Sequence, residues 1–145
     1  MMDENTLERI KSRPEDVIRY VARQRLVTFA RYIKPQLQIT NFHKIYYEVL
    51  DRFAHGRIRK LIVSVSPQSG KSEGSSRFLP AFLLGLNPDL KIVIGSYNAD
   101  QAKSFNRDVQ RIVNSEAYKA VFPDTCFNNG RRRMDNVYQR NSEVS

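Results

Sequence analysis

Two kinds of apolar pattern alternate along the chain. Apolar residues recur every three or four positions over 14–33, 41–54 and 98–113, and this spacing predicts amphipathic helices. The shorter runs 60–65 and 91–96 are mostly continuous apolar stretches, which are typical of strands buried on both faces of a parallel sheet. Because a helical segment follows each run, the order forms a β-α-β unit. The pattern therefore predicts an α/β architecture with a parallel sheet, preceded by N-terminal helices.

Capping and helix-breaking residues indicate where these helices begin and end. Pro14 stands in a capping-box pattern that opens the first helix, and Pro35 ends it. Asn41 is the predicted N-cap of the second helix, and Gly56 is the residue expected just past its C-terminus. A third helix should begin near Gly70 and be kinked or interrupted at position 80, a proline. The helix over 98–113 opens with a further capping-box pattern.

The segment between the first predicted strand and the following helix has the composition of a phosphate-binding loop. Backbone N–H groups of a tight turn and of a helix N-terminus attract an anion. Lys71 would then reach the β- and γ-phosphates, and the Ser72 hydroxyl would ligate the accompanying Mg²⁺. Val65 replaces the first glycine of the usual G-x-x-x-x-G-K-[ST] pattern, so an ordinary helix cap containing a lysine is the alternative. The surrounding strand and helix favour nucleotide binding by Pro67, Gln68, Ser69, Gly70, Lys71 and Ser72.

Charge and composition narrow the class of protein. Hydrophobic residues make up 41% of the chain, which excludes a disordered or fibrous protein. The net charge of +9 indicates an anionic partner, with nucleic acid as the first candidate. Possible DNA contacts are the basic run Arg131, Arg132 and Arg133 and basic residues on the outer faces of the helices, although a solvated charged surface is the alternative.

The remaining composition points to the cytoplasm. Cys126 is the single cysteine, so no intrachain disulfide forms, and a reducing compartment is expected. The N-terminus lacks a basic-then-apolar signal sequence. No apolar run approaches the ~20 residues of a membrane span.

Several segments together resemble the ATPase domain of the large terminase subunit of tailed bacteriophages and prophages. The resemblance covers about residues 25–125 and includes positions with no role in binding nucleotide. It is carried by Phe42-His43, the loop with its preceding apolar run, and the segments 78–85, 87–89, 94–97, 102–105 and 118–123.

The resemblance implies a P-loop motor of the ASCE (RecA-like) type, which hydrolyses ATP with Mg²⁺ to drive double-stranded DNA into a prohead. It implies nucleotide contact by His43 as well as by the loop. It also implies that the portal protein and the small terminase subunit are partners, that the full-length protein forms a ring, and that it works in the cytoplasm of the bacterial host.

Two departures from the family pattern bear on catalysis. The family commonly has an arginine in the loop, whereas this loop has Gln68 and Ser69. No apolar strand closing in Asp-Asp or Asp-Glu occurs before Ser145, so the catalytic carboxylate and the nuclease domain are expected beyond that residue. We therefore expect residues 1–36 to form a helical lead-in and residues 37–145 to form the N-terminal portion of the ATPase domain. This incomplete domain should bind nucleotide with little or no hydrolysis.

Two other classes compete with this interpretation. The chain could be a catalytically inert, basic DNA- or partner-binding module, whose binding would weaken steeply with salt. It could also be another P-loop enzyme, such as a helicase or a small-molecule kinase, which the family-like segments disfavour.

Overall fold

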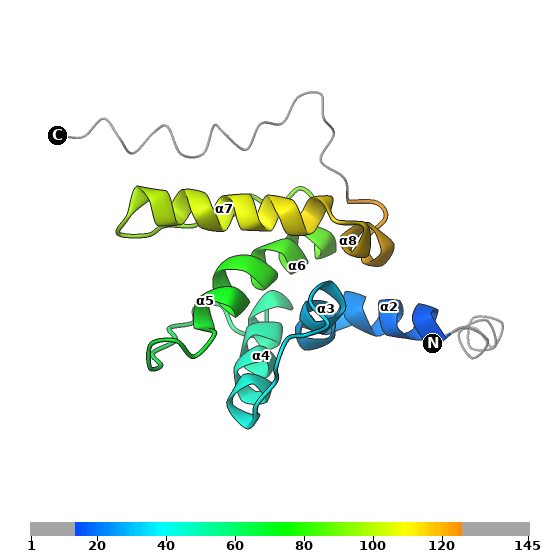
Figure 1. Ribbon diagram of the computed structural model, residues 1–145, viewed down its shortest axis with the longest axis horizontal. Helices are drawn as coiled ribbons and strands as arrows, with labels where there is room; N and C mark the ends of the chain where they lie inside the picture. The colour runs from blue at the N-terminus through cyan, green and yellow to red at the C-terminus, as the bar shows by residue number, and fades with distance from the viewer. Residues whose placement is uncertain (1–13, 126–145) are drawn as a thin grey trace.

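The computed structural model describes residues 14–125, and all regular structure within that range is helical. Helix α7 runs along one edge of the molecule, with α6 beside it, α2, α3 and α8 gathered at one end, and α4 on the opposite side (Figure 1). The elements, of which η1 is a π-helix, are α2 (Pro14–Gln24), α3 (Leu26–Ile33), α4 (Asn41–Ala54), α5 (Lys71–Glu73), η1 (Gly74–Phe78), α6 (Leu79–Leu86), α7 (Ala99–Asn114) and α8 (Glu116–Val121).

The predicted α/β fold with its parallel sheet is therefore wrong for residues 14–125. Neither 60–65 nor 91–96 forms a strand. Burial alternates along both segments: Leu61 and Val63 pack against the helical core, whereas Ile62 is 96% exposed. Along the second segment Ile92 packs inward and Val93 is 74% exposed. This period of two is typical of extended chain, but a strand also needs a hydrogen-bonded neighbour about 4.8 Å away. The described part of the chain provides none.

The helices lie close to where the apolar spacing predicts them, with one break. The predicted helix 14–33 is divided at Arg25, which has an extended backbone (φ −128°, ψ 117°). The Leu26 N–H, at the start of α3, donates to Asp51 Oδ1 of α4 at 2.8 Å. The Arg25 guanidinium lies 3.6 Å from the other oxygen of the same carboxylate. A side chain 25 positions further along thus satisfies the new helix end.

Most of the predicted helix ends and interruptions are confirmed. Gly56 follows the end of α4 with a φ of +72°. The Asn98 side chain caps α7 by accepting the Asp100 N–H at 2.9 Å. The helical run that begins at Lys71 changes from π to α at Leu79, so that Pro80 lies in the first turn of α6. A proline has no N–H to give to the helical ladder, which makes this position tolerable.

An aromatic cluster forms the centre of the core. The fully buried ring of Phe29 in α3 lies 5.4 Å from that of Phe82 in α6, 5.9 Å from that of Tyr118 and 5.8 Å from that of Phe122. The Tyr118 hydroxyl donates to the Ala81 carbonyl at 2.9 Å, so the buried phenol is satisfied. Within residues 14–125, no helix is long and apolar enough to cross a membrane.

Truncating the central ring tests this account of the core. We expect Phe29→Ala to lower the free energy of unfolding by about 3–5 kcal/mol, because it removes a buried side chain and leaves a cavity. Urea unfolding followed by circular dichroism measures the change. Ile62→Ala, at a 96% exposed position, is the control and should shift the midpoint little. Equal effects of the two substitutions would contradict the proposed core.

Candidate functional site

The site is built first on the N-terminus of α4. The N-cap is Thr40 and not the predicted Asn41: the Thr40 Oγ1 accepts the His43 N–H at 3.5 Å. In return, His43 Nδ1 accepts the Thr40 N–H at 3.3 Å and lies 2.8 Å from Thr40 Oγ1. A ring nitrogen that accepts an N–H carries no proton of its own. With Nδ1 used as an acceptor, the ring N–H lies on Nε2 and can be donated away from the cap.

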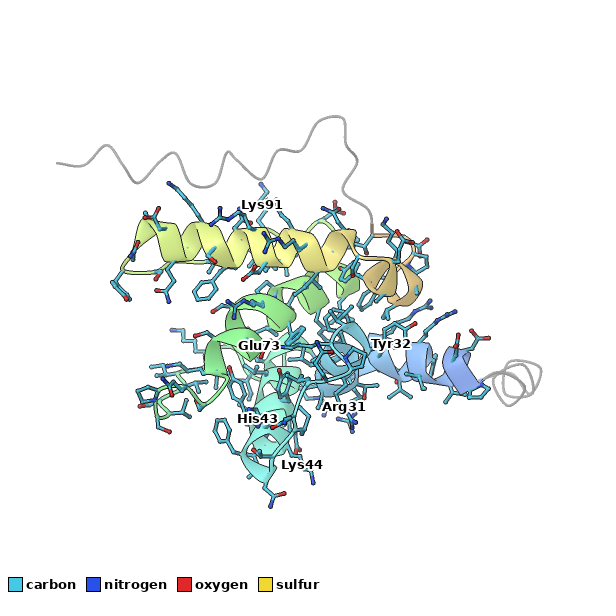
Figure 2. All side chains as sticks on the ribbon, viewed as in Figure 1. Arg31, Tyr32, His43, Lys44, Glu73 and Lys91 are labelled. Atoms are coloured by element: carbon cyan, nitrogen blue, oxygen red, sulfur yellow. The ribbon has the colours of Figure 1, made fainter. Side chains whose placement is uncertain are left out.

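His43 Nε2 is directed at Gly70 of the loop. A Cβ placed on Gly70 would lie 3.0 Å from Nε2, so any other residue at this position would force the imidazole to move by a few tenths of an ångström. Figure 2 shows His43 on α4 and Glu73 at the start of the helical run that follows the loop. Two predicted site residues that lie 27 positions apart in the sequence are thus brought into contact. The result is an N–H donor at the surface of the loop.

The loop backbone has two left-handed residues, a feature that it shares with anion-binding nests. Gln68 (φ 62°) and Gly70 (φ 75°) are left-handed, and Lys71 begins a right-handed helix. Alternating left- and right-handed residues turn successive N–H groups toward one side, where they form a concave, partly positive surface. A left-handed conformation costs a residue such as Gln68 roughly 1–2 kcal/mol, and strain of this kind clusters at ligand-binding turns.

The Ser69 hydroxyl is the buried polar atom of this turn. Its Oγ is inaccessible to solvent and has no hydrogen-bond partner among the described residues. Leaving a buried hydroxyl unsatisfied costs roughly 1–3 kcal/mol. Because the Oγ is shielded from solvent, a bound oxyanion would reach this O–H only after the turn had opened.

Three contacts missed by the sequence analysis fix the beginning of the helical run. The Tyr46 hydroxyl donates to the Lys71 carbonyl at 2.7 Å, and the Ser75 hydroxyl donates to the same oxygen at 2.9 Å. Lys34 at the end of α3 pairs with Glu73 at 2.5 Å. Tyr46 could have been found, because it follows His43 by one turn of α4 and shares its face. The sequence gives no comparable signal for Lys34.

The electrostatic character of the site is that of a donor set. Glu73, the carboxylate next to the loop in sequence, is already paired with Lys34, so it does not neutralise Lys71. Burial raises the pKa of the Tyr46 phenol, which keeps the hydroxyl protonated and donating. Within residues 14–125, no group of three His, Cys, Asp or Glu side chains could hold a metal ion.

The other predicted site residues are placed as follows. Pro67 and Gln68 are exposed in the turn, whereas Lys71 and Ser72 are half-buried at the beginning of α5. The predicted DNA contacts are Arg131, Arg132 and Arg133, and they lie outside the residues that the structure describes.

A scan against models of protein families finds no match to the chain, and searches of curated proteins and of solved structures find none either. The resemblance to the large terminase subunit therefore stays a prediction made from the sequence. The geometry of the site carries the functional argument.

Two glycines with nearly the same backbone allow the His43 contact to be tested. Gly70→Ala and Gly56→Ala place a Cβ at φ +75° and +72°, so each should cost about 1–2 kcal/mol of stability. Only at Gly70 does the new Cβ meet another residue, because nothing lies within 4 Å of it at Gly56. We expect the His43 imidazole resonances in NMR spectra to move only in Gly70→Ala. Equal changes in both variants would contradict the contact.

Proposed function

We propose that the chain binds a nucleoside triphosphate, ATP with Mg²⁺, at the loop 67–72 with His43 as an additional donor. The observation that carries the proposal is the approach of His43 Nε2 to Gly70 directly before Lys71. His43 is a donor and Lys71 a cation, and the adjacent carboxylate of Glu73 is paired with Lys34. Such a set fits an anion with several negative oxygens and disfavours a cation or a neutral ligand.

The donor set supports phosphate binding on an observation independent of the motif. His43, which lies outside the motif, brings its Nε2 to Gly70, and the Ser69 hydroxyl would join the donors once a ligand opens the turn that shields it. In the proposed complex the nest N–H groups, Ser69 and His43 hold the phosphate chain. Lys71 carries the neutralising charge, and Ser72 ligates the Mg²⁺ that accompanies the nucleotide.

An aromatic surface on the same turn of α4 supports a nucleoside over inorganic phosphate. Phe42 is 37% exposed, and its ring stacks almost parallel on Tyr46, with a centroid distance of 5.6 Å and an interplanar angle of 8°. The preorganised outer face of Phe42 can take a base by stacking. Tyr46 links this face to the loop through its hydrogen bond with Lys71.

On the strength of the sequence resemblance, we further propose that nucleotide binding serves a phage DNA-packaging motor. Its partners would then be double-stranded DNA, a portal protein and a small terminase subunit. The carboxylate beside the loop is engaged by Lys34 and is not assigned as a catalytic base. The proposal is therefore binding with little or no turnover by these residues.

Removing the loop lysine tests the nucleotide proposal. We expect Lys71→Ala to weaken the binding of a fluorescent ATP analogue with Mg²⁺ by about ten- to hundredfold, because a charge-assisted contact to phosphate is lost. Fluorescence anisotropy titration measures the affinity. Lys119→Ala, on α8, is the matched control, because it removes the same charge far from the loop.

Two results would contradict the proposal. Wild-type protein that fails to bind the analogue would exclude this nucleotide site. Rapid ATP hydrolysis by the wild-type chain, abolished in Lys71→Ala, would contradict the expectation of little turnover.

A specific observation also favours the second candidate function, nucleic-acid binding. Lys103, Arg107 and Arg111 follow one another at four-residue spacing on the exposed side of α7. Neighbouring like charges at this spacing repel each other, so the row is better satisfied by an anionic partner. Among the described residues Arg107 has no ion-pair partner, and the only carboxylate near Arg111 is shared. Asp108 lies 3.3 Å from Arg111 but 2.7 Å from Arg77.

The surroundings of this row suit a phosphate backbone. Arg107 and Arg111 line a shallow groove together with Gln110, Asn114 and Ser115. Amide groups such as that of Asn114 commonly contact the phosphates and sugars of nucleic acids, whereas the Ser115 hydroxyl is engaged with Ile112 and Tyr118. We therefore propose α7 as the surface that would carry DNA binding, separately from the loop.

The dependence of binding on salt tests this second function. We expect Arg107→Ala/Arg111→Ala to reduce the slope of log K against log salt for duplex DNA by about 1.8, since two phosphate contacts are lost. Arg57→Ala/Arg59→Ala, at exposed positions beyond α4, is the matched control for net charge. Equal slopes for the two double variants would show that only overall charge attracts DNA.

A further inference from the structure

The position of Lys71 is set by a side chain of α4. The Lys71 carbonyl receives the Tyr46 hydroxyl at 2.7 Å as well as the Ser75 hydroxyl at 2.9 Å. The first of these bonds joins two elements that lie 25 residues apart, whereas the second is local. Tyr46 therefore ties the residue that carries the loop's cation to the helix that carries His43.

The Tyr46 ring has little freedom to move. It is 4% exposed, stacks on Phe42, and meets Tyr47 edge to face with ring centroids 5.7 Å apart. The backbone of the π-helix lies against it: a Cβ on Gly74 would be 2.7 Å from Tyr46 Cε1. A ring held on these sides keeps its hydroxyl at a fixed place, and the hydroxyl in turn holds the Lys71 carbonyl.

The π-helix makes such a tether necessary. η1 begins three residues after Lys71, and its wider turn closes with the Leu79 N–H donating to the Gly74 carbonyl. A single π-turn shifts the helical register and occurs frequently at functional sites. The direction in which Lys71 leaves the helix therefore does not follow from α6 alone. The hydrogen bond from the Tyr46 hydroxyl to the Lys71 carbonyl determines this direction at the N-terminal end of the helical run.

We infer that Tyr46 is a positioning residue, whose hydrogen bond to the Lys71 carbonyl aligns the lysine with His43 and so sets the affinity for the terminal phosphates of a triphosphate. This inference rests on the proposed nucleotide site. His43 and Tyr46 lie one turn apart on α4, so the same helix presents one donor itself and orients the second. Lys71 would serve the outer phosphates, so the effect of Tyr46 should concern ATP more than AMP.

Tyr46→Phe removes the hydroxyl and keeps the packed ring. With the whole chain and Mg²⁺, we expect this variant to bind ATP about five- to tenfold more weakly, with AMP affinity nearly unchanged. In a double-mutant cycle, Tyr46→Phe/Lys71→Ala should bind ATP no more weakly than Lys71→Ala, because the hydroxyl acts through the lysine. Isothermal titration calorimetry measures all affinities. Ser75→Ala removes the second donor to the Lys71 carbonyl. It should likewise weaken ATP binding relative to AMP binding.

Tyr32→Phe is the matched control. It removes a phenol that accepts a hydrogen bond from Arg19 at 3.1 Å on α3, and it should leave the ATP to AMP ratio unchanged. A Tyr46→Phe protein that keeps the wild-type ratio, or whose loss adds to that of Lys71→Ala, overturns the inference while leaving the nucleotide site in place. Equal ATP affinity of wild type and Lys71→Ala instead excludes the nucleotide site itself, and the inference with it.

Discussion

Burial of the Phe29 ring is the interaction on which the rest of the structure depends. This ring lies in α3 and packs against Phe82 of α6, Tyr118 of α8 and Phe122 just after α8. Its burial therefore brings these three helices together. Because these ring contacts hold α6, they also hold the C-terminal end of the helical run that begins at Lys71. α4 is joined to α3 by the bond from Leu26 to Asp51, so it too takes its place from the core. The loop between these helices needs few contacts of its own. Its geometry is set by the two helices that meet beside it.

The parts of the fold that depend on local chemistry could be predicted from the sequence. Apolar spacing gives the helices, and Gly56, Pro80 and Asn98 mark helix ends or interruptions through properties of the single residue. The predicted strands were wrong because strand formation depends on non-local pairing. An extended, apolar stretch becomes a strand only when another stretch pairs with it, and that pairing is not encoded at Ile62 or Val93 themselves. The break at Arg25 is likewise non-local, because the carboxylate that satisfies it comes from α4.

The candidate site likewise has a part that could be predicted from the sequence and a part that could not. The loop residues and His43 were predicted from a motif and from a family resemblance, and the structure brings His43 to Gly70. The contacts of Tyr46 and Lys34 with the beginning of the helical run were not predicted, because their side chains serve equally well as core or surface residues of their own helices. A sequence motif contains the residues that contact a ligand. The residues that hold them in place come from other elements of the fold that pack against the motif. Such groups become visible only after the packing is known.

The two proposed anion-binding surfaces are joined by one short segment. η1 begins three residues after Lys71, and its Arg77 reaches across to α7, where it pairs with Asp108 at 2.7 Å and lies over the Phe105 ring at 5.3 Å. Asp108 is shared, because its other carboxylate oxygen lies 3.3 Å from Arg111. The position of Arg77 therefore bears on the ion pairs of Asp108. That position depends on the same turn that the hydrogen bond from Tyr46 stabilises.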